Sequence, residues 1–216
     1  MLQLPLVVWH AVAKLEHLRA LLLNVAPGCC SVTGALCGLT ALTALSIRGH
    51  SGGGEGACIG LHELFASCIA RMRGLVTLTL EVSSETYRHR QYRPGEAEET
   101  LKCIAATLPT LPLLESVNVC TPELGDSRPL TAAALSELRD CVKGLCRLRR
   151  FILSLAPVRI GRAGDLGMKW PKELLQALVT LPTLEEARLH PIVAKSGNCG
   201  RYFQLLALLS RPHGPT

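Results

Sequence analysis

A leucine frame recurs six times along this chain and constrains its fold more than any other feature. The frame reads Leu-x-x-Leu-x-x-Leu-x-Leu, with other residues in place of some leucines. It starts at Leu15, Leu39, Met72, Leu111, Leu145 and Leu181, so successive starts lie 24, 33, 39, 34 and 36 residues apart. Self-similarity at a period of about 20–50 residues indicates stacked repeats, in which neighbouring units bury each other's apolar faces.

Each frame contains a strand pattern, and most frames follow a helical one. In the third unit, Leu61, Leu64, Phe65, Cys68, Ile69 and Met72 follow helical spacing, which is typical of an amphipathic helix. The frame then ends in Leu78-Thr79-Leu80, the period of two of a strand. Alternating helices and strands predict parallel strands joined by crossovers. These strands are expected near Leu21–Leu23, Leu45–Ile47, Leu78–Leu80, Val117–Val119, Phe151–Leu153 and Ala187–Leu189.

On these motifs, the chain resembles the leucine-rich-repeat family over about residues 15–192. The resemblance implies an α/β solenoid with about six parallel strands on the concave face and helices on the convex face. The family usually has Asn or Cys three residues after the last strand leucine. Here those positions hold Ala26, His50, Ser83, Pro122, Ala156 and Ile192, so we expect an irregular arc with insertions.

We expect one domain over residues 1–209 with a capping helix at each end, followed by a flexible tail over residues 210–216. Val8, Ala11, Val12, Leu15 and Leu18 follow helical spacing at the first end. At the other end, the closing helix is suggested by Tyr202, Leu205, Leu206 and Leu209. No apolar run approaches the roughly 18 residues of a membrane span.

Ten cysteines bear on the redox state and on metal binding. They include no Cys-x-x-Cys pair, and Cys58, Cys68, Cys103 and Cys141 fall in apolar helical runs, where a free thiol behaves as a small hydrophobe. We therefore expect a reduced, intracellular chain, cytoplasmic or nuclear, without a zinc site or other cofactor. The net charge of +6 permits an acidic partner without requiring nucleic acid.

The residues between the inward leucines of each strand are the expected binding surface of the concave face. They include no paired carboxylates and no base beside a nucleophile, which favours recognition over chemistry. The predicted partner-binding residues are Arg48, Thr77, Thr79, Glu81, Ser116, Asn118, Arg150, Ser154, Glu186, Arg188 and His190. Ala44, Ser46, Cys120 and Ile152 are expected on the same face.

A basic loop, defined as residues 87–93, is the second predicted contact. It lies in the longest interval between frames and interleaves arginine with tyrosine; its predicted contact residues are Tyr87, Arg88, Arg90, Tyr92 and Arg93. Both residue types are enriched at interface hot spots. Four glutamates flank the loop (Glu85, Glu96, Glu98 and Glu99), which favours an acidic protein surface over RNA as its partner.

Two alternatives to a simple interaction module remain open. Gly49-His50-Ser51-Gly52-Gly53 resembles the nucleophile elbow of the α/β-hydrolase family, and Asp126 and His190 follow in triad order. Only 50 residues precede Ser51, too few for the central strands of that fold. The other alternative is the substrate-recognition arm of an F-box-type ubiquitin ligase adaptor, although Leu4-Pro5-Leu6 is the sole trace of an F-box. The sequence therefore predicts a non-enzymatic protein-interaction module, a scaffold or adaptor subunit of a larger assembly.

Overall fold

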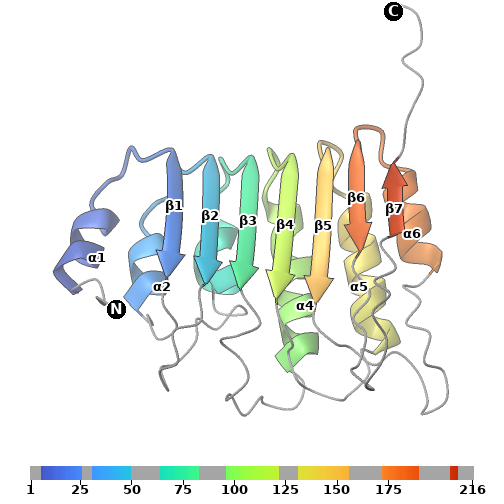
Figure 1. Ribbon diagram of the computed structural model, residues 1–216, viewed down its shortest axis with the longest axis horizontal. Coiled ribbons are helices and arrows are strands. Elements are labelled where there is room, and N and C mark those ends of the chain that lie inside the picture. Colours follow the sequence, from blue (N-terminus) through green and yellow to red (C-terminus); the bar gives the residue numbers. More distant parts are fainter. Residues whose placement is uncertain are drawn as a thin grey trace, which may run out of the picture.

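Seven strands form one open sheet in which the spatial order of the strands follows the sequence (Figure 1). The computed structural model describes residues 6–25, 31–49, 64–82, 96–121, 131–155, 172–189 and 205–208. The strands are β1 (Ala20–Val25), β2 (Ala44–Gly49), β3 (Thr77–Val82), β4 (Ser116–Thr121), β5 (Arg150–Leu155), β6 (Glu186–Leu189) and β7 (Leu205–Leu208). Strands β1 to β6 are parallel, as predicted, and β7 is antiparallel to β6.

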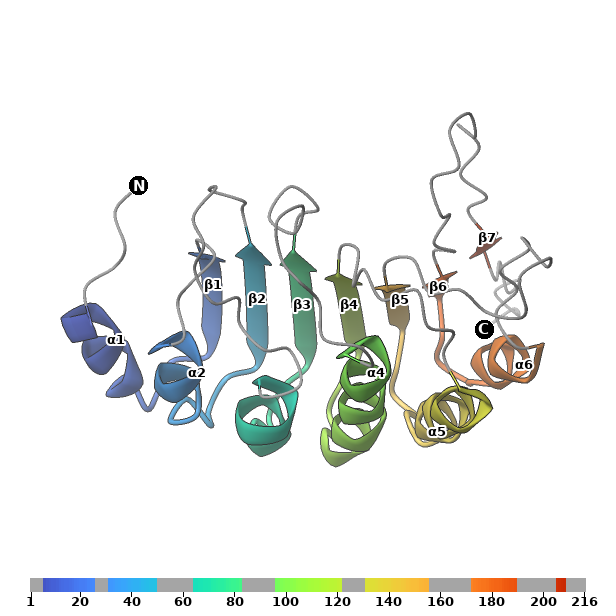
Figure 2. The same ribbon diagram turned by 90° about the horizontal axis from the view of Figure 1, so that it is seen from below.

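The helices form a second layer along one side of the sheet, as Figure 2 shows. They are α1 (Leu6–Ala13), α2 (Ser31–Leu36), the π-helix η1 (Leu64–Cys68), the 3-10 helix η2 (Ile69–Arg71), α4 (Glu96–Thr107), the 3-10 helix η4 (Leu108–Thr110), α5 (Ala132–Lys143) and α6 (Lys172–Val179). In the part of the chain that the structure describes, the other side of the sheet carries no helix, and we call it the helix-free face. No described helix is both long enough and apolar enough to cross a bilayer.

The core lies between the two layers because strands β1 to β6 turn alternate side chains toward the helices. In β3, Leu78 and Leu80 are buried, whereas Thr77 and Thr79 are partly exposed on the helix-free face. Helix side chains such as Leu101 complete the same apolar layer. Burying one leucine contributes about 1.5–3 kcal/mol, so this layer is the main source of stability.

The first half of the frame forms the same turn before five of the strands. The N–H of the second apolar residue donates to the carbonyl of the first, with N–O distances of 2.9–3.4 Å. The pairs are Leu18 to Leu15, Leu42 to Leu39, Leu75 to Met72, Leu114 to Leu111, and Leu148 to Leu145. From Leu39 onward both residues of each pair are buried, so the turn anchors the strand entry in the core.

A shared carbonyl then joins each strand entry to the preceding one. Two consecutive N–H groups donate to a single carbonyl of the preceding unit, with N–O distances of 2.7–3.0 Å. The accepting carbonyls belong to Arg19, Thr43, Val76, Glu115 and Arg149, and the donor pairs are residues 43/44, 76/77, 115/116, 149/150 and 185/186. Because this junction recurs five times, residues at the same frame position lie side by side across the sheet.

Two predicted helices differ in detail from those observed. Helix α1 ends at Ala13, so Leu15 and Leu18 belong to the turn before β1 rather than to the helix. The third stripe forms the π-helix η1 and then the 3-10 helix η2 instead of one α-helix. Its described apolar residues are nevertheless buried as predicted.

The predicted closing helix is wrong for residues 205–208, which form strand β7. The segment Leu205-Leu-Ala-Leu208 is apolar at every position, so its own sequence does not decide between helix and strand. As a strand it supplies hydrogen-bond partners to the outer edge of β6, which would otherwise be left open. Tyr202 and Leu209 lie outside the described residues.

A disulfide joins Cys37 to Cys68, which contradicts the prediction of a free thiol at Cys68. The two residues are 31 positions apart in sequence, but Cys37 directly follows α2 and Cys68 ends η1 in the next unit, with their Cα atoms 4.4 Å apart. The free cysteines among the described residues are Cys103, Cys120, Cys141 and Cys146. Burial raises the pKa of Cys141 to about 12, so this thiol is neutral at physiological pH.

Replacing Leu78 with alanine tests the core. The side chain is fully buried between layers, so Leu78→Ala is expected to lower the free energy of unfolding by about 2–5 kcal/mol. The matched control is Leu22→Ala, at a side chain that is 60% exposed, with an expected loss below about 1 kcal/mol. Urea denaturation measures both values, and equal losses would contradict this assignment of the core.

Candidate protein-interaction face

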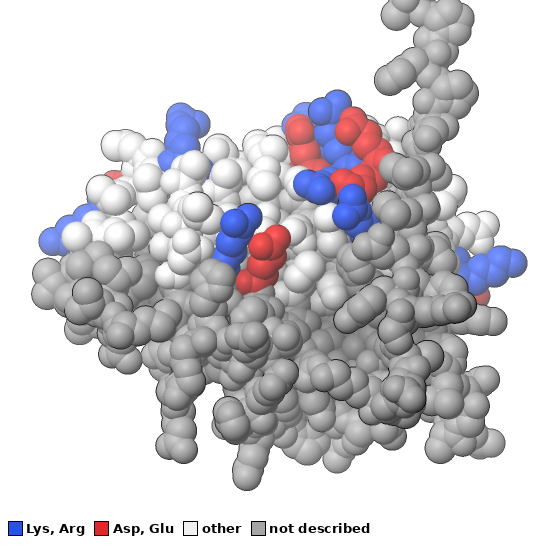
Figure 3. Space-filling view, in the orientation of Figure 1, with Lys and Arg blue, Asp and Glu red and all other residues white. Residues whose placement is uncertain are grey.

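The predicted partner-binding residues of the strands lie on the helix-free face, which Figure 3 shows in the orientation of Figure 1. Strand register arranges them in three rows. The first row is Ala44, Thr77, Ser116, Arg150 and Glu186; the second is Ser46, Thr79, Asn118, Ile152 and Arg188; the third is Arg48, Glu81, Cys120 and Ser154. His190 and the whole basic loop lie outside the described residues, as do Ser51 and Asp126.

A chain of polar contacts crosses β2, β3 and β4 and joins the third row to Asn118 of the second row. Arg48 Nε lies 3.2 Å from Glu81 Oε2, and Asn118 Nδ2 donates to Glu81 Oε1 at 2.9 Å. Cys120 Sγ in turn donates to Asn118 Oδ1 at 3.2 Å. The chain fixes the orientation of the Asn118 amide, because its nitrogen faces a carboxylate and its oxygen faces a thiol.

The environment of Cys120 keeps its thiol protonated. Burial raises the pKa of Cys120, and the negative charge of Glu81 raises it further. A nucleophilic cysteine requires the opposite surroundings, with a nearby cation or helix N-terminus that favours the thiolate. Cys120 therefore acts in this face as a hydrogen-bond donor.

A second charged group lies over β5 and β6. The carboxylate of Glu186 forms ion pairs with two arginines. Arg150 Nε lies 2.6 Å from its Oε2, and Arg188 Nε pairs with its Oε1. Beside them, Arg149 Nε lies 3.3 Å from Glu185 Oε1. The Arg150 side chain remains 50% exposed although it is paired, so a partner can still reach it.

Short neutral side chains occupy much of the rest of the described face. Figure 3 shows the two charged groups apart, one over β2 and β3 and one over β5 and β6. Thr77, Thr79 and Ser116 lie between them and are partly exposed. Ile152 was expected to be accessible on this face, but it is only 6% exposed. It lies between Asn118 and Arg188 in its row.

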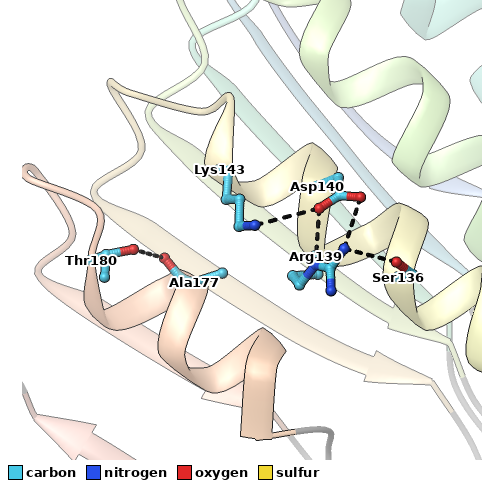
Figure 4. A network of polar contacts seen from close by, with 6 residues as sticks. All are labelled: Ser136, Arg139, Asp140, Lys143, Ala177 and Thr180. Atoms are coloured by element: carbon cyan, nitrogen blue, oxygen red, sulfur yellow. Dashed lines mark hydrogen bonds and ion pairs between the residues drawn. The ribbon is translucent and has the colours of Figure 1, made fainter.

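Figure 4 shows a charged group on helix α5 whose members pair with one another. On α5, Arg139 donates to both carboxylate oxygens of Asp140, at 2.9 and 3.0 Å, and to Ser136 Oγ at 2.9 Å. The hydrogen bond from Arg139 lowers the pKa of Asp140, so the pair stays ionised. These contacts join residues of a single helix, whereas the Arg48–Glu81 and Arg150–Glu186 pairs join neighbouring strands.

The described residues include several carboxylates and cysteines. Among them, no group of three or more His, Cys, Asp or Glu side chains is placed to hold a metal ion. The carboxylates on the helix-free face are paired with arginines.

The sequence predicted which residues lie on the helix-free face, but it did not predict the ion pairs between them. Arg48 and Glu81 occupy the same frame position in successive units, as do Arg150 and Glu186. Opposite charges at equivalent positions of successive frames could have predicted these ion pairs. Comparison of the chain with protein-family models and with curated proteins finds no match.

Alkylation of Cys120 tests the polar chain. Glu81→Gln removes a negative charge that raises the pKa of this thiol, so the thiolate fraction at a given pH should increase. The pH profile of iodoacetamide labelling at Cys120, followed by mass spectrometry, should move to lower pH. The matched control is Glu185→Gln in the other charged group, which should leave the profile unchanged. An unchanged profile in both variants would show that Glu81 does not act on Cys120.

Proposed function

We propose that this chain is a non-enzymatic leucine-rich-repeat module that binds a protein partner through its helix-free face, as a scaffold or adaptor subunit of a larger assembly. The observation that carries the repeat assignment is the shared-carbonyl junction, which recurs at five successive strand entries. Each junction joins one helix–strand unit to the next, which is how repeat proteins are stabilised. The strands of the solenoid would thus form a rigid binding surface for the partner.

The composition of the helix-free face supports binding rather than a purely structural role. Its pair of Arg48 with Glu81 is about half-exposed, at 52% and 39%. Such surface pairs contribute only about 0–1 kcal/mol to stability. A partner carboxylate or backbone carbonyl can therefore compete for the arginines at little cost to the fold, and arginine is enriched at interface hot spots.

The neutral centre of the face supports the same reading. Thr77, Thr79 and Ser116 have short side chains, so a partner can approach the sheet closely between the two charged groups. Their hydroxyl groups both donate and accept hydrogen bonds. The proposed surface thus combines an adaptable centre with charged ends that set the orientation of the partner.

Blocking the centre of the face tests the proposal. Thr79→Arg with Ser116→Arg places two long side chains on the helix-free face. Partners of the unmutated, tagged protein are identified first by affinity purification and mass spectrometry. We expect binding of the purified partner to the double variant to weaken about tenfold or more, equivalent to about 1.4 kcal/mol.

The matched control adds the same charge to the helix layer. Ala133 and Gln176 are exposed on α5 and α6, so Ala133→Arg with Gln176→Arg should leave both binding and melting temperature unchanged. Equal loss of binding in both double variants would mean that added charge, and not the face, is responsible. Full binding by both would reject the helix-free face as the partner site.

The basic loop is proposed as a second contact with an acidic partner surface, on the strength of its sequence. The triple variant Arg88→Ala, Arg90→Ala and Arg93→Ala is expected to weaken partner binding without changing the melting temperature. A control of equal charge change removes three exposed arginines elsewhere, at Arg71, Arg73 and Arg147. Unchanged binding in the loop variant would remove the loop from the interface. A steep salt-dependent loss of RNA binding by the unmutated protein would indicate a nucleic-acid partner instead.

A further inference from the structure

The outer edge of β1 is an open strand edge at the end of the sheet. Strand β1 pairs with β2 on one side, and the described residues provide no partner on the other. The strand reads Ala-Leu-Leu-Leu-Asn-Val and carries no charge. Exposed strand edges are normally blunted by charges, prolines or a covering segment, because they invite pairing with another chain.

The unit that contains β1 also leaves large apolar side chains exposed to solvent. Leu15 is 50% exposed and Leu22 is 60% exposed, two of the four large apolar side chains that are exposed among the described residues. Leu21 is partly exposed, whereas its equivalents Leu45 and Leu78 are buried. Apolar surface is thus available on both faces of the strand beside its open edge.

The recurring shared-carbonyl junction shows which backbone groups of the first unit are available to a further strand. Thr43 N and Ala44 N share the Arg19 carbonyl, and the same arrangement recurs at every later strand entry up to β6. The equivalent donors of the first unit are Arg19 N and Ala20 N, for which no acceptor lies among the described residues. Backbone groups of successive strand residues point to opposite edges, so those of Leu22 and Asn24 also point outward.

We propose that this edge binds an extended segment of a partner protein, which adds to the sheet as a further parallel strand with apolar residues at alternate positions. Parallel addition follows from the junction, since one carbonyl of the segment would accept from both Arg19 N and Ala20 N. The apolar residues of the segment would pack on Leu21 and Leu15. The site lies apart from the helix-free face, so it goes beyond the proposed function.

The position of α1 favours a single strand over a larger occupant. Figures 1 and 2 agree that α1 lies beyond β1, in the helix layer. A second copy of this chain, or a complete helix–strand unit, would bring its own helices into that space. An extended segment occupies only the sheet layer and leaves α1 in place.

A peptide that copies residues 75–82 is a suitable probe, because β3 already shows how such a strand pairs with the next. In the β3–β4 register, Thr77 lies opposite Ser116 and Leu78 opposite Val117. The same register on β1 places Thr77 of the peptide opposite Ala20 and Leu78 opposite Leu21. The peptide carries a fluorophore and two terminal lysines for solubility. A control peptide exchanges Thr77 with Leu78 and Thr79 with Leu80, which keeps the composition and shifts the alternation by one residue.

Binding is measured by fluorescence anisotropy with the full chain and two variants at one position. Leu22→Pro removes an outward N–H without affecting the pairing with β2, because proline is tolerated at a strand edge when its nitrogen faces outward. Leu22→Ala keeps that N–H. We expect the peptide to bind the unmutated chain and Leu22→Ala, and Leu22→Pro to weaken binding about tenfold or more. The control peptide should bind weakly to all three.

Several outcomes would overturn the proposal. These are failure of the peptide to bind the unmutated chain, equal binding by Leu22→Pro, and equal binding of the control peptide. Circular dichroism and the melting temperature establish that Leu22→Pro is folded; if it is not, Asn24→Pro provides the same test at the next outward N–H. A dimer in sedimentation that Leu22→Pro abolishes would assign the edge to a second copy instead. Slow hydrogen exchange at Ala20, Leu22 and Asn24 in the monomer without peptide would show that this chain covers the edge itself.

Discussion

The shared carbonyl between successive strand entries is the contact on which the rest of the architecture depends. It is a backbone contact, so it tolerates Arg19, Thr43, Val76, Glu115 and Arg149 equally well as the accepting residue. By fixing where strands β2 to β6 begin, it sets which side chains meet across the sheet. Leucine packing supplies the larger energy, but packing alone would allow strands to slip by two residues and still bury the same face. The junction removes that freedom.

The fold was largely predictable because its signals are local. Frame spacing, helical stripes and the alternation around Thr79 each lie within a few residues of one another. The failures concern relationships between distant segments. Residues 205–208 are compatible with either helix or strand, and the need of β6 for an edge partner decided between them. The pairing of Cys37 with Cys68 depends on which helices become neighbours, a property that no short stretch of sequence contains.

On the helix-free face, too, local features were predictable from the sequence and contacts between distant segments were not. Strand alternation correctly placed Arg48, Glu81, Asn118 and Arg150 on one side of the sheet. It could not show that Glu81 is shared between Arg48 and Asn118, because that depends on register across three strands. Nor could it show that Ile152 is covered, because alternation predicts the direction of a side chain and not the size of its neighbours.

The disulfide between Cys37 and Cys68 also bears on how the chain opens. In proteins built from stacked units, unfolding starts most easily at the ends, where a unit has one neighbour instead of two. The first unit, with its exposed Leu15 and Leu22, can fray alone. Fraying beyond it meets a covalent link that ties the second unit to the third. On the proposed repeat architecture, the two linked units would unfold together, and the disulfide would confine fraying to the first unit.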